Sequence, residues 1–476
     1  MVPCVVMTRL SNTHLTVRSA TRRVATAVIA IVLAVGNAGI ASAQGMPIIR
    51  DTEIEEILKA YAKPVFEAGQ IPPESVSILM INDNAINAFV TQGNAMFFHT
   101  GLLLASKSSN EVIGVMAHET GHIVGGHAVT FSDKVATAST AAILATLLGV
   151  AAGVASGNAD VGLAAVLGGQ ASAQRLLFSF SRGQESQADQ FALRALEQTG
   201  QSPQGLYDFF SLLAGQELLI TDSQDPYIRT HPLTRERMTS VEFAVQNSAF
   251  AKKPPDPEAE RLHRRLVAKL YAFLKPQMTT FQKYPESNTS PEARYAQSIA
   301  YYRRGQVKES LPLIDGLIKE TPTDPFYWEL KGQMLLENSR VEDAVVALRE
   351  ASRLKPNAPL IRVLLAHAMV ETGNPDHAAE TQATLEAALR TDPEDAFAWD
   401  LAAKSYLLSG NKGMSAYAAA ERALLTGDFG DVVRYTQEAE QVLEKGTPTW
   451  YRLQDIKITA QNYLQEFMEK RRGRQR

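Results

Sequence analysis

The sequence contains a single cysteine among its 476 residues. One cysteine excludes a disulfide-stabilised scaffold and any zinc site built from cysteine side chains. The chain also lacks a basic surplus, with 47 Lys and Arg against 51 Asp and Glu. Dedicated nucleic-acid binders usually carry excess positive charge, so we expect no nucleic-acid partner. With 45% hydrophobic residues, the chain can still bury two or three cores, at about 150 residues per domain.

A long apolar segment is missing from the N-terminus as well. Three arginines precede the apolar run from Val24 to Gly36, which is shorter than the roughly 20 residues that span a bilayer. Ala41-Ser42-Ala43 then supplies the small residues of a signal-peptidase site. A membrane anchor is the alternative interpretation. The features favour a cleaved signal peptide and export.

The remaining sequence divides by composition into several zones. A stretch rich in proline and charge, Lys252 to Pro257, separates a mixed first zone from a purely helical one. We therefore predict a signal peptide at 1–43, a first folded domain at 44–251, a linker with leading helices at 252–290, a repeat domain at 291–465 and a basic tail at 466–476.

The first domain shows short β-prone runs among helical patterns. The runs at 76–81, 85–90 and 95–98 are separated by the turn signals Asn82-Asp83-Asn84 and Gln92-Gly93-Asn94. Two successive hairpins would give a small antiparallel β-sheet. The sequence thus predicts a mainly α fold with one small sheet in this domain.

The helical zone contains an internal repeat. Pro291–Asp324 and Pro325–Ala358 are consecutive copies of 34 residues, and the second has Trp328 at the position typical of a tetratricopeptide repeat. A third copy ending near Pro393 is three residues longer, and a fourth around Trp399 is looser. An unrelated helical bundle is the alternative. The regular spacing favours an α-solenoid, whose stacked helix pairs build a concave binding surface.

The segment His118-Glu119-Thr120-Gly121-His122 matches H-E-x-x-H. A spacing of four residues on a helix puts both imidazoles on one face, where they can share a metal ion. Neutral imidazole is a good ligand for Zn²⁺, and Glu119 is placed to take a proton from the attacking water. The motif also occurs by chance on ordinary amphipathic helices, so a further ligand must support it.

Glu185 and Asp189 offer that support because they are also four residues apart. Glu185 can complete a His₂Glu site, and Asp189 can hydrogen-bond the far nitrogen of a ligand imidazole. A solvated acidic helix face is the alternative interpretation. In combination with the H-E-x-x-H motif, the pair favours zinc ligation.

A third histidine ten residues after the first would instead indicate a metzincin. Here His127 falls one residue short, and position 128 is alanine. One residue turns a side chain by about 100° around a helix. We therefore expect His127 to lie outside the ligand set, in a structural role or behind a ligand.

The segment 138–174 is rich in Ala, Gly, Leu and Val. Its nearly uncharged part is too short to span a bilayer. A buried helical hairpin over the active site is one interpretation. A mobile apolar flap in peripheral contact with a membrane or a client protein is the other.

The motifs resemble those of the prenyl-protease-type gluzincin metallopeptidases. The resemblance extends to Asn87-Ala88-Phe89, Gly93, Phe98-His99-Thr100-Gly101-Leu102, His231-Pro232 and Arg237. It implies one Zn²⁺ per chain, bound by His118, His122 and Glu185, with Glu119 as catalytic base and Asp189 behind the histidines. It also implies catalytic roles for His231 and Arg237, either of which can stabilise the oxyanion.

With an export signal and repeats, the chain resembles the periplasmic members of this family in Gram-negative bacteria. The resemblance implies a zinc endopeptidase that degrades misassembled outer-membrane proteins and assists assembling ones. The repeats would recruit these clients or the barrel-assembly machinery. A periplasmic chaperone or adaptor, with a repressed or vestigial zinc site, is the alternative function.

Two further expectations concern the site itself. An extended substrate would pair with a sheet edge near Ala95–Phe98. His231 precedes a proline and so favours an extended backbone, in a loop able to fold over the zinc position. We expect His231 to act as a fourth ligand in a resting state, with hydrogen bonding to the transition state or simple packing as alternatives.

Overall fold

The computed structural model describes residues 47–91, 93–127, 182–214, 227 and 231–474. The predicted signal peptide and the segment 138–174 lie outside the described residues, so both stay predictions. Among the helices that are described, none is long and apolar enough to cross a membrane.

The sheet has four strands in the order β1-β2-β4-β3. These are β1 (Ile48–Ile49), β2 (Ser77–Ile81), β3 (Ala88–Thr91) and β4 (Ala95–His99). The β3–β4 and β1–β2 pairings are antiparallel, whereas β2 and β4 run parallel with Leu79 opposite Phe97. The expected small sheet is present, but it is mixed rather than wholly antiparallel.

The loop between β2 and β3 explains this difference, because it is a crossover and not a hairpin turn. The Asp83 carbonyl accepts hydrogen bonds from the Gly101 N–H at 2.8 Å and the Thr100 hydroxyl at 2.9 Å. Gly101 permits this approach, since a Cβ there would lie 2.1 Å from the Asn84 carbonyl oxygen. The loop therefore passes the end of β4, and β4 enters the sheet between β2 and β3.

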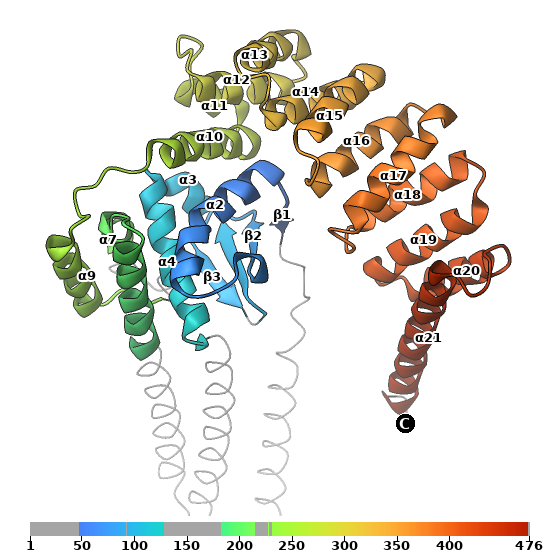
Figure 1. The fold of residues 1–476 in the computed structure, drawn as a ribbon, viewed down its shortest axis with the longest axis horizontal. Coiled ribbons are helices and arrows are strands. Elements are labelled where there is room, and N and C mark those ends of the chain that lie inside the picture. Colours follow the sequence, from blue (N-terminus) through green and yellow to red (C-terminus); the bar gives the residue numbers. More distant parts are fainter. Residues whose placement is uncertain (1–46, 92, 128–181, 215–226, 228–230, 475–476) are drawn as a thin grey trace, which may run out of the picture. The chain divides into compact units, whose positions relative to one another are not determined.

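Helices pack around this sheet in the blue to green part of Figure 1. They are α2 (Thr52–Ala68), α3 (Thr100–Ala105), α4 (Ser109–Val124), α7 (Gln204–Ala214) and α9 (Arg235–Asn247). The helix α2 packs against β2 and α4, while α4 also contacts β3 and α7. Their apolar side chains form one core with the sheet, which includes Phe66, Phe98 and Phe210. This core holds α4 in a fixed position.

The helix α10 (Pro257–Leu274) belongs to two cores at once. Its residues Leu266 and Leu270 lie in the core around the sheet, whereas Ala268 and Ala272 lie in the core of the first repeat. This helix falls within the segment 252–290 that we predicted as a linker with leading helices. The segment is thus a packed connection between the two parts of the chain.

The remaining helices form consecutive antiparallel pairs (Figure 1). After α11 (Gln277–Lys283) come α12 (Pro291–Arg303), α13 (Val307–Glu320), α14 (Pro325–Glu337), α15 (Val341–Leu354), α16 (Pro359–Glu371), α17 (Ala378–Leu389), α18 (Ala396–Leu408), α19 (Lys412–Thr426), α20 (Phe429–Glu440) and α21 (Pro448–Arg474). The predicted fold class, a gluzincin-like domain followed by a tetratricopeptide solenoid, is confirmed.

The repeat signature has a direct physical basis in this solenoid. The Trp328 indole donates to the carbonyl of Pro322 at 3.0 Å, and Trp399 donates to Pro393 at 2.9 Å. Each bond joins the first helix of one repeat to the end of the preceding repeat. Tryptophan and the terminal proline therefore recur together because they are hydrogen-bond partners.

A cluster of buried charges joins α2 to α10 and α12. Glu53, which is 1% exposed, forms ion pairs with Arg265 and with Lys269, the latter at 3.0 Å. The Tyr295 hydroxyl donates to the same carboxylate at 2.9 Å, and Lys269 also reaches Asp51 at 2.7 Å. Burial would raise the pKa of Glu53, but Arg265 and Lys269 outweigh burial and hold it below its ordinary value.

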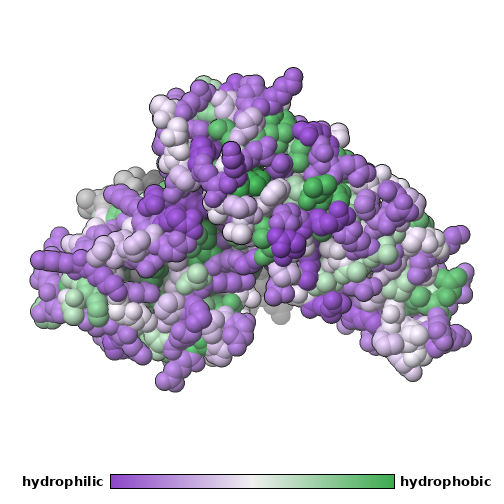
Figure 2. All heavy atoms as spheres, turned by 45° about the horizontal axis from the view of Figure 1, so that its top comes forward, coloured by the Kyte–Doolittle hydropathy of each residue, from purple (hydrophilic) through white to green (hydrophobic). Residues whose placement is uncertain are grey.

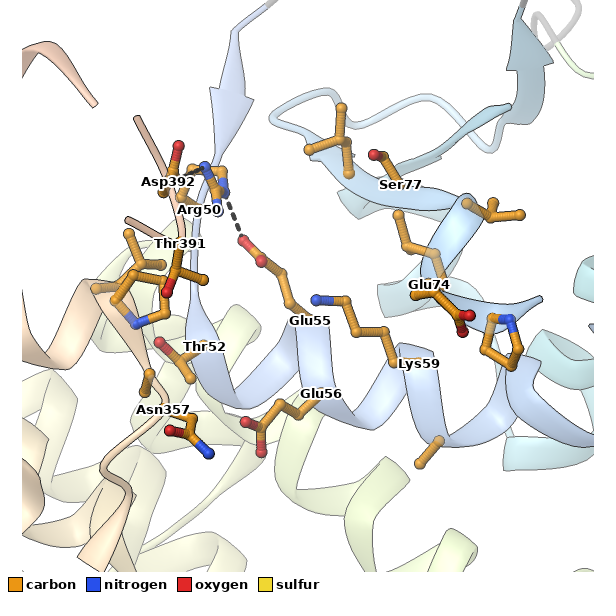
Figure 3. A pocket seen from close by; sticks show the side chains of 18 of the residues that line it. Arg50, Thr52, Glu55, Glu56, Lys59, Glu74, Ser77, Asn357, Thr391 and Asp392 are labelled. Atoms are coloured by element: carbon orange, nitrogen blue, oxygen red, sulfur yellow. Dashed lines mark hydrogen bonds and ion pairs between the residues drawn. The ribbon is translucent and has the colours of Figure 1, made fainter. Parts of the chain in front are cut away.

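A groove of about 810 Å³ lies beside this cluster, between α2, β2 and the loops that begin the repeat helices. Figure 3 shows charged side chains of both signs around it, with Glu56 and Lys59 on α2 and Asn357 opposite. Arg50 spans part of the groove, reaching Glu55 at 2.8 Å and Asp392 at 3.1 Å. The face drawn in Figure 2 is largely hydrophilic, with separate hydrophobic areas.

We predict that Glu53→Gln lowers the free energy of unfolding by about 3–5 kcal/mol at pH 7, because Arg265 and Lys269 then share only the carboxylates of Asp324 and Asp51. Chemical denaturation of the full chain measures this. Glu56→Gln is the matched control: Glu56 pairs with Lys355 at 2.7 Å, and both side chains are more than a third exposed. A change of no more than about 1 kcal/mol is expected for the control.

Lowering the pH should reduce the difference in free energy of unfolding between wild type and Glu53→Gln. Folding lowers the pKa of the Glu53 carboxyl below its ordinary value of 4.5. Such a carboxyl stabilises the fold above its ordinary pKa, and this contribution is lost as the pH falls through the lowered value. Equal losses for both variants, or a difference independent of pH, would contradict this account of the cluster.

Candidate active site

The helix α4 presents the H-E-x-x-H motif from a buried position. The Ser108 side chain caps its first turn by accepting from the Glu111 N–H at 3.4 Å. His118 and Glu119 are fully buried, and His122 is 7% exposed. The ring centroids of His118 and His122 lie 4.8 Å apart, as their spacing of four residues predicts. The local sequence therefore accounts for this half of the site.

The second half comes from the helical residues 182–198, which contact α4 at very short range. A Cβ on Gly121 would lie 2.7 Å from the Ala188 Cα. Glycine at one helix and alanine at the other let the two backbones approach, so Glu185 and Asp189 reach the histidines. Sequence reasoning treated Gly121 only as a variable position in the motif, although a glycine inside a helix is a signal for close packing.

Four side chains converge at this contact. His118, His122, Glu185 and His231 each offer one ligand atom, and these atoms all lie within 4.8 Å of one another. The Glu185 carboxylate lies 3.3 Å from His118 Nε2 and 3.4 Å from His122 Nε2. All three expected ligands and the expected fourth ligand are thus in one buried cluster.

Asp189 and Arg237 lie directly behind the ligand atoms. Asp189 Oδ1 is 2.9 Å from His118 Nδ1, and the Arg237 guanidinium forms bonds of 2.6 and 2.8 Å to the same carboxylate. Arg237 also reaches Glu185 at 2.9 Å and the Pro232 carbonyl at 3.0 Å. The arginine therefore holds both carboxylates and the chain beside His231 in place.

His231 enters from the chain that precedes α9. Its Nδ1 lies 3.2 Å from both Glu185 oxygens and 3.5 Å from His118 Nε2. The Tyr227 ring stacks on it with centroids 4.6 Å apart. Tyr227 was not among the residues singled out from the sequence, because nothing in its local pattern distinguishes it from a core tyrosine.

Glu119 stands apart from the other buried carboxylates. Neither of its oxygens has a hydrogen-bond partner among the described residues, and His231 Nε2 lies 3.6 Å from its Oε1. Burial raises the pKa of the Glu119 carboxyl, with His231 and His118 opposing that rise. A buried, unpaired carboxylate next to a cluster of ligand atoms suits a group that exchanges a proton with a bound water.

The electrostatics of the cluster favour a cation. Burial opposes protonation of His118, but Asp189 and Glu185 outweigh it and raise its pKa to about 9. Burial lowers the pKa of His122 well below its ordinary value, and His118 adds to that effect. Interactions with His231 and His118 overcome burial and keep the pKa of Glu185 well below its ordinary value. The site thus combines a carboxylate with neutral imidazole and attracts positive charge.

His127 lies outside the ligand set, yet it touches a member of it. Its Nδ1 is 2.9 Å from His122 Nδ1. The reason differs from the rotation that we expected, because α4 ends at Val124 and the chain turns at Gly125 and Gly126. The turn, and not a continuing helix, decides where His127 points.

The expected substrate edge at Ala95–Phe98 is wrong. These residues form β4, which is paired on one side with β2 and on the other with β3. A strand bonded on both sides has no free backbone groups for a peptide. Within the described sheet β3 is the edge strand on this side, and α4 packs against it.

Comparison with known proteins agrees with this geometry. Residues 49–244 match the model of peptidase family M48, and residues 335–405 match a tetratricopeptide repeat model. Residues 49–244 form a family M48 metallopeptidase domain. Since the His, His, Glu and His cluster lies inside this domain, the chain is a metalloprotease, as the sequence predicted.

Two curated relatives match over most of this chain and most of their own length. The chain is 23% identical over 431 residues to the beta-barrel assembly-enhancing protease of Escherichia coli strain K12, covering 88% of this chain and 85% of the relative. It is 23% identical over 386 residues to the protein of that name from Yersinia pestis, covering 77% and 75%. Metalloprotease YcaL of Escherichia coli is 30% identical over 174 residues, which is 35% of this chain and 63% of that protein.

We predict that Gly121→Ala destabilises the M48 domain by about 1–3 kcal/mol, because the added methyl forces α4 away from the helix at 182–198. The variant should also bind a metal ion more weakly, as measured by competition with a coloured chelator. Gly316→Ala is the control, since its Cβ would meet only Arg294 at 3.6 Å.

Removing a helical glycine without a clash should stabilise the chain by about 0.5–1 kcal/mol. If Gly121→Ala behaves like Gly316→Ala in both measurements, the helix contact does not position the ligands.

Proposed function

We propose that the protein is a zinc-dependent endopeptidase of the periplasm that acts in quality control of outer-membrane proteins. The observation that carries this proposal is the buried cluster of His118, His122, Glu185 and His231 beside the unpaired carboxylate of Glu119. Two imidazoles and a carboxylate are the ligand set of catalytic zinc sites that leave a position for water.

His118, His122 and Glu185 would hold the zinc ion, with Asp189 fixing the ring of His118. When bound there, zinc lowers the pKa of a coordinated water to about 7 and polarises the scissile carbonyl. Glu119 then accepts the proton of the attacking water and donates it to the leaving amine. Neither of its oxygens accepts a hydrogen bond from the described residues, so both remain available to that proton.

Arg237 and His231 divide the remaining tasks. The Arg237 guanidinium is bonded to Asp189, Glu185 and the carbonyls of His231 and Pro232. We therefore propose that Arg237 positions these groups. His231 Nε2 has no hydrogen-bond partner in the described part of the chain and points towards Glu119. It is therefore the better placed of the two to stabilise the oxyanion.

A regulatory role is the alternative for this histidine, and it is the one that we favour. With its Nδ1 among the ligand atoms, His231 can occupy the position that the catalytic water needs. Four protein ligands leave a tetrahedral zinc ion without an open position. We propose that the resting enzyme has His231 in this place and that displacement of its imidazole opens the site.

Substrate would bind as an extended strand along β3. This edge is adjacent to α4, and backbone pairing accepts many sequences, as a protease of misfolded proteins requires. Clients would be misassembled or assembling outer-membrane proteins, and the solenoid would bring them or the barrel-assembly machinery to the M48 domain. The names of the curated relatives and the repeat architecture support this role.

We predict that Glu119→Gln keeps zinc and fold but loses about 10²–10⁴-fold in peptidase activity, since general-base catalysis contributes that much. Cleavage of an unfolded outer-membrane barrel protein, with zinc content measured in parallel, tests this. Normal turnover by the variant would refute the assignment of the base. If the inactive variant still restores outer-membrane assembly in cells, the chaperone function dominates instead.

His231→Ala is predicted to raise basal proteolysis, because removal of the imidazole opens a ligand position. The control is His263→Ala, which removes another buried histidine, located on α10, whose Nε2 lies 3.3 Å from the Ser106 carbonyl. Its activity per folded molecule should equal that of wild type. Lower activity of His231→Ala with zinc retained would make His231 a donor to the transition state and exclude the resting-state ligand.

A further inference from the structure

The turn after α4 places His127 against the second histidine of the motif. Gly126 has a φ of 61°, a left-handed conformation that glycine adopts without strain. A Cβ on Gly125 would lie 2.3 Å from His127 Nε2, so only glycine leaves room for the ring. The Gln184 amide reaches the His127 carbonyl at 3.4 Å. The local sequence is therefore built to hold this imidazole, which is 5% exposed.

Both ring nitrogens of His127 lie within hydrogen-bond distance of a neighbouring side chain. His127 Nδ1 lies 2.9 Å from His122 Nδ1, and His127 Nε2 lies 3.1 Å from the Gln187 side-chain oxygen. The two imidazole rings meet edge to face at 76° with centroids 4.9 Å apart. On the other side of its ring, His122 Nε2 faces the cluster, 3.4 Å from Glu185.

One arrangement of protons satisfies all these contacts. His122 Nε2 needs its lone pair to bind a metal ion, so the proton of the neutral ring must sit on Nδ1. That proton can be donated only if His127 Nδ1 carries a lone pair. The proton of His127 then sits on Nε2, where the oxygen of Gln187 accepts it. The reverse arrangement would put a proton on His122 Nε2 and prevent ligation.

We propose that His127 is a positioning residue that fixes the tautomer and the ring orientation of His122. It does for His122 what Asp189 does for His118, with a neutral imidazole in place of an ion-paired carboxylate. This inference rests on the proposed function, in which His122 binds zinc. Partners behind a ligand histidine typically change metal affinity by about 10–100-fold.

The test compares two replacements of nearly equal shape. In His127→Asn the amide oxygen takes the place of Nδ1 as an acceptor at the same distance from the backbone, whereas His127→Leu offers no acceptor. Zinc affinity is measured on the full chain by competition with a coloured chelator. We expect His127→Leu to bind about 10–100-fold more weakly, with one zinc at saturation, and His127→Asn to remain within about threefold of wild type.

Equal loss in both variants would reduce His127 to a packing role, and wild-type affinity in both would remove it from the site. Either result overturns the proposal. Gly125→Ala adds an independent arm, because its methyl displaces the ring of His127 without changing any polar group. It should weaken zinc binding, whereas Gly183→Ala, whose Cβ would meet nothing within 4 Å, should not.

A second readout follows the proton itself. In ¹H–¹⁵N spectra of the zinc-loaded protein, His122 should show a protected Nδ1–H that is lost in His127→Leu and kept in His127→Asn. Gln187 is exposed, so water can replace its oxygen and Gln187→Ala should change affinity little. Glu185→Ala separates the two levels of inference. If Glu185→Ala retains zinc, the proposed zinc site is wrong. If Glu185→Ala loses zinc while the His127 variants bind it like wild type, only the role of His127 is wrong.

Discussion

The close contact between α4 and the helical residues 182–198 is the constraint on which the active site depends. Gly121 and Ala188 allow the two backbones to meet, and each helix then contributes two polar side chains to the buried space. His118 and His122 come from one helix, Glu185 and Asp189 from the other. A larger side chain at the contact would move the two imidazoles away from the two carboxylates, and the four side chains would no longer meet.

Burial of this polar cluster carries an energetic cost that the surrounding network offsets. Asp189 lies between His118 and Arg237, and Arg237 in turn reaches Glu185 and the backbone at His231. Buried charges are tolerated when they are paired and hydrogen-bonded. Glu119 is the exception, because both of its oxygens lack hydrogen-bond partners within the described residues. The network therefore leaves one carboxylate without a hydrogen-bond partner, among the described residues, beside four side chains that could hold a metal ion.

A second buried charge cluster links the M48 domain to the solenoid. Glu53 lies on the first turn of α2, and its partners Arg265 and Lys269 lie on α10, a helix shared by both cores. Separating the two parts would expose apolar surface and strand a buried carboxylate. The helix pairs of the first repeat are thus part of what stabilises the peptidase domain.

The sequence by itself determined the features that depend on local spacing. The metal motif on a helix, the acidic pair four residues apart and the 34-residue repeats all follow from helical periodicity, and the structure has them at the predicted positions. Only the tertiary structure decided which strand is the sheet edge, since the crossover at Asp83 depends on a contact with Gly101. It likewise decided the partner of His127 and the double role of α10. These features depend on how backbones approach one another across the fold, and no local pattern of residue types encodes that distance.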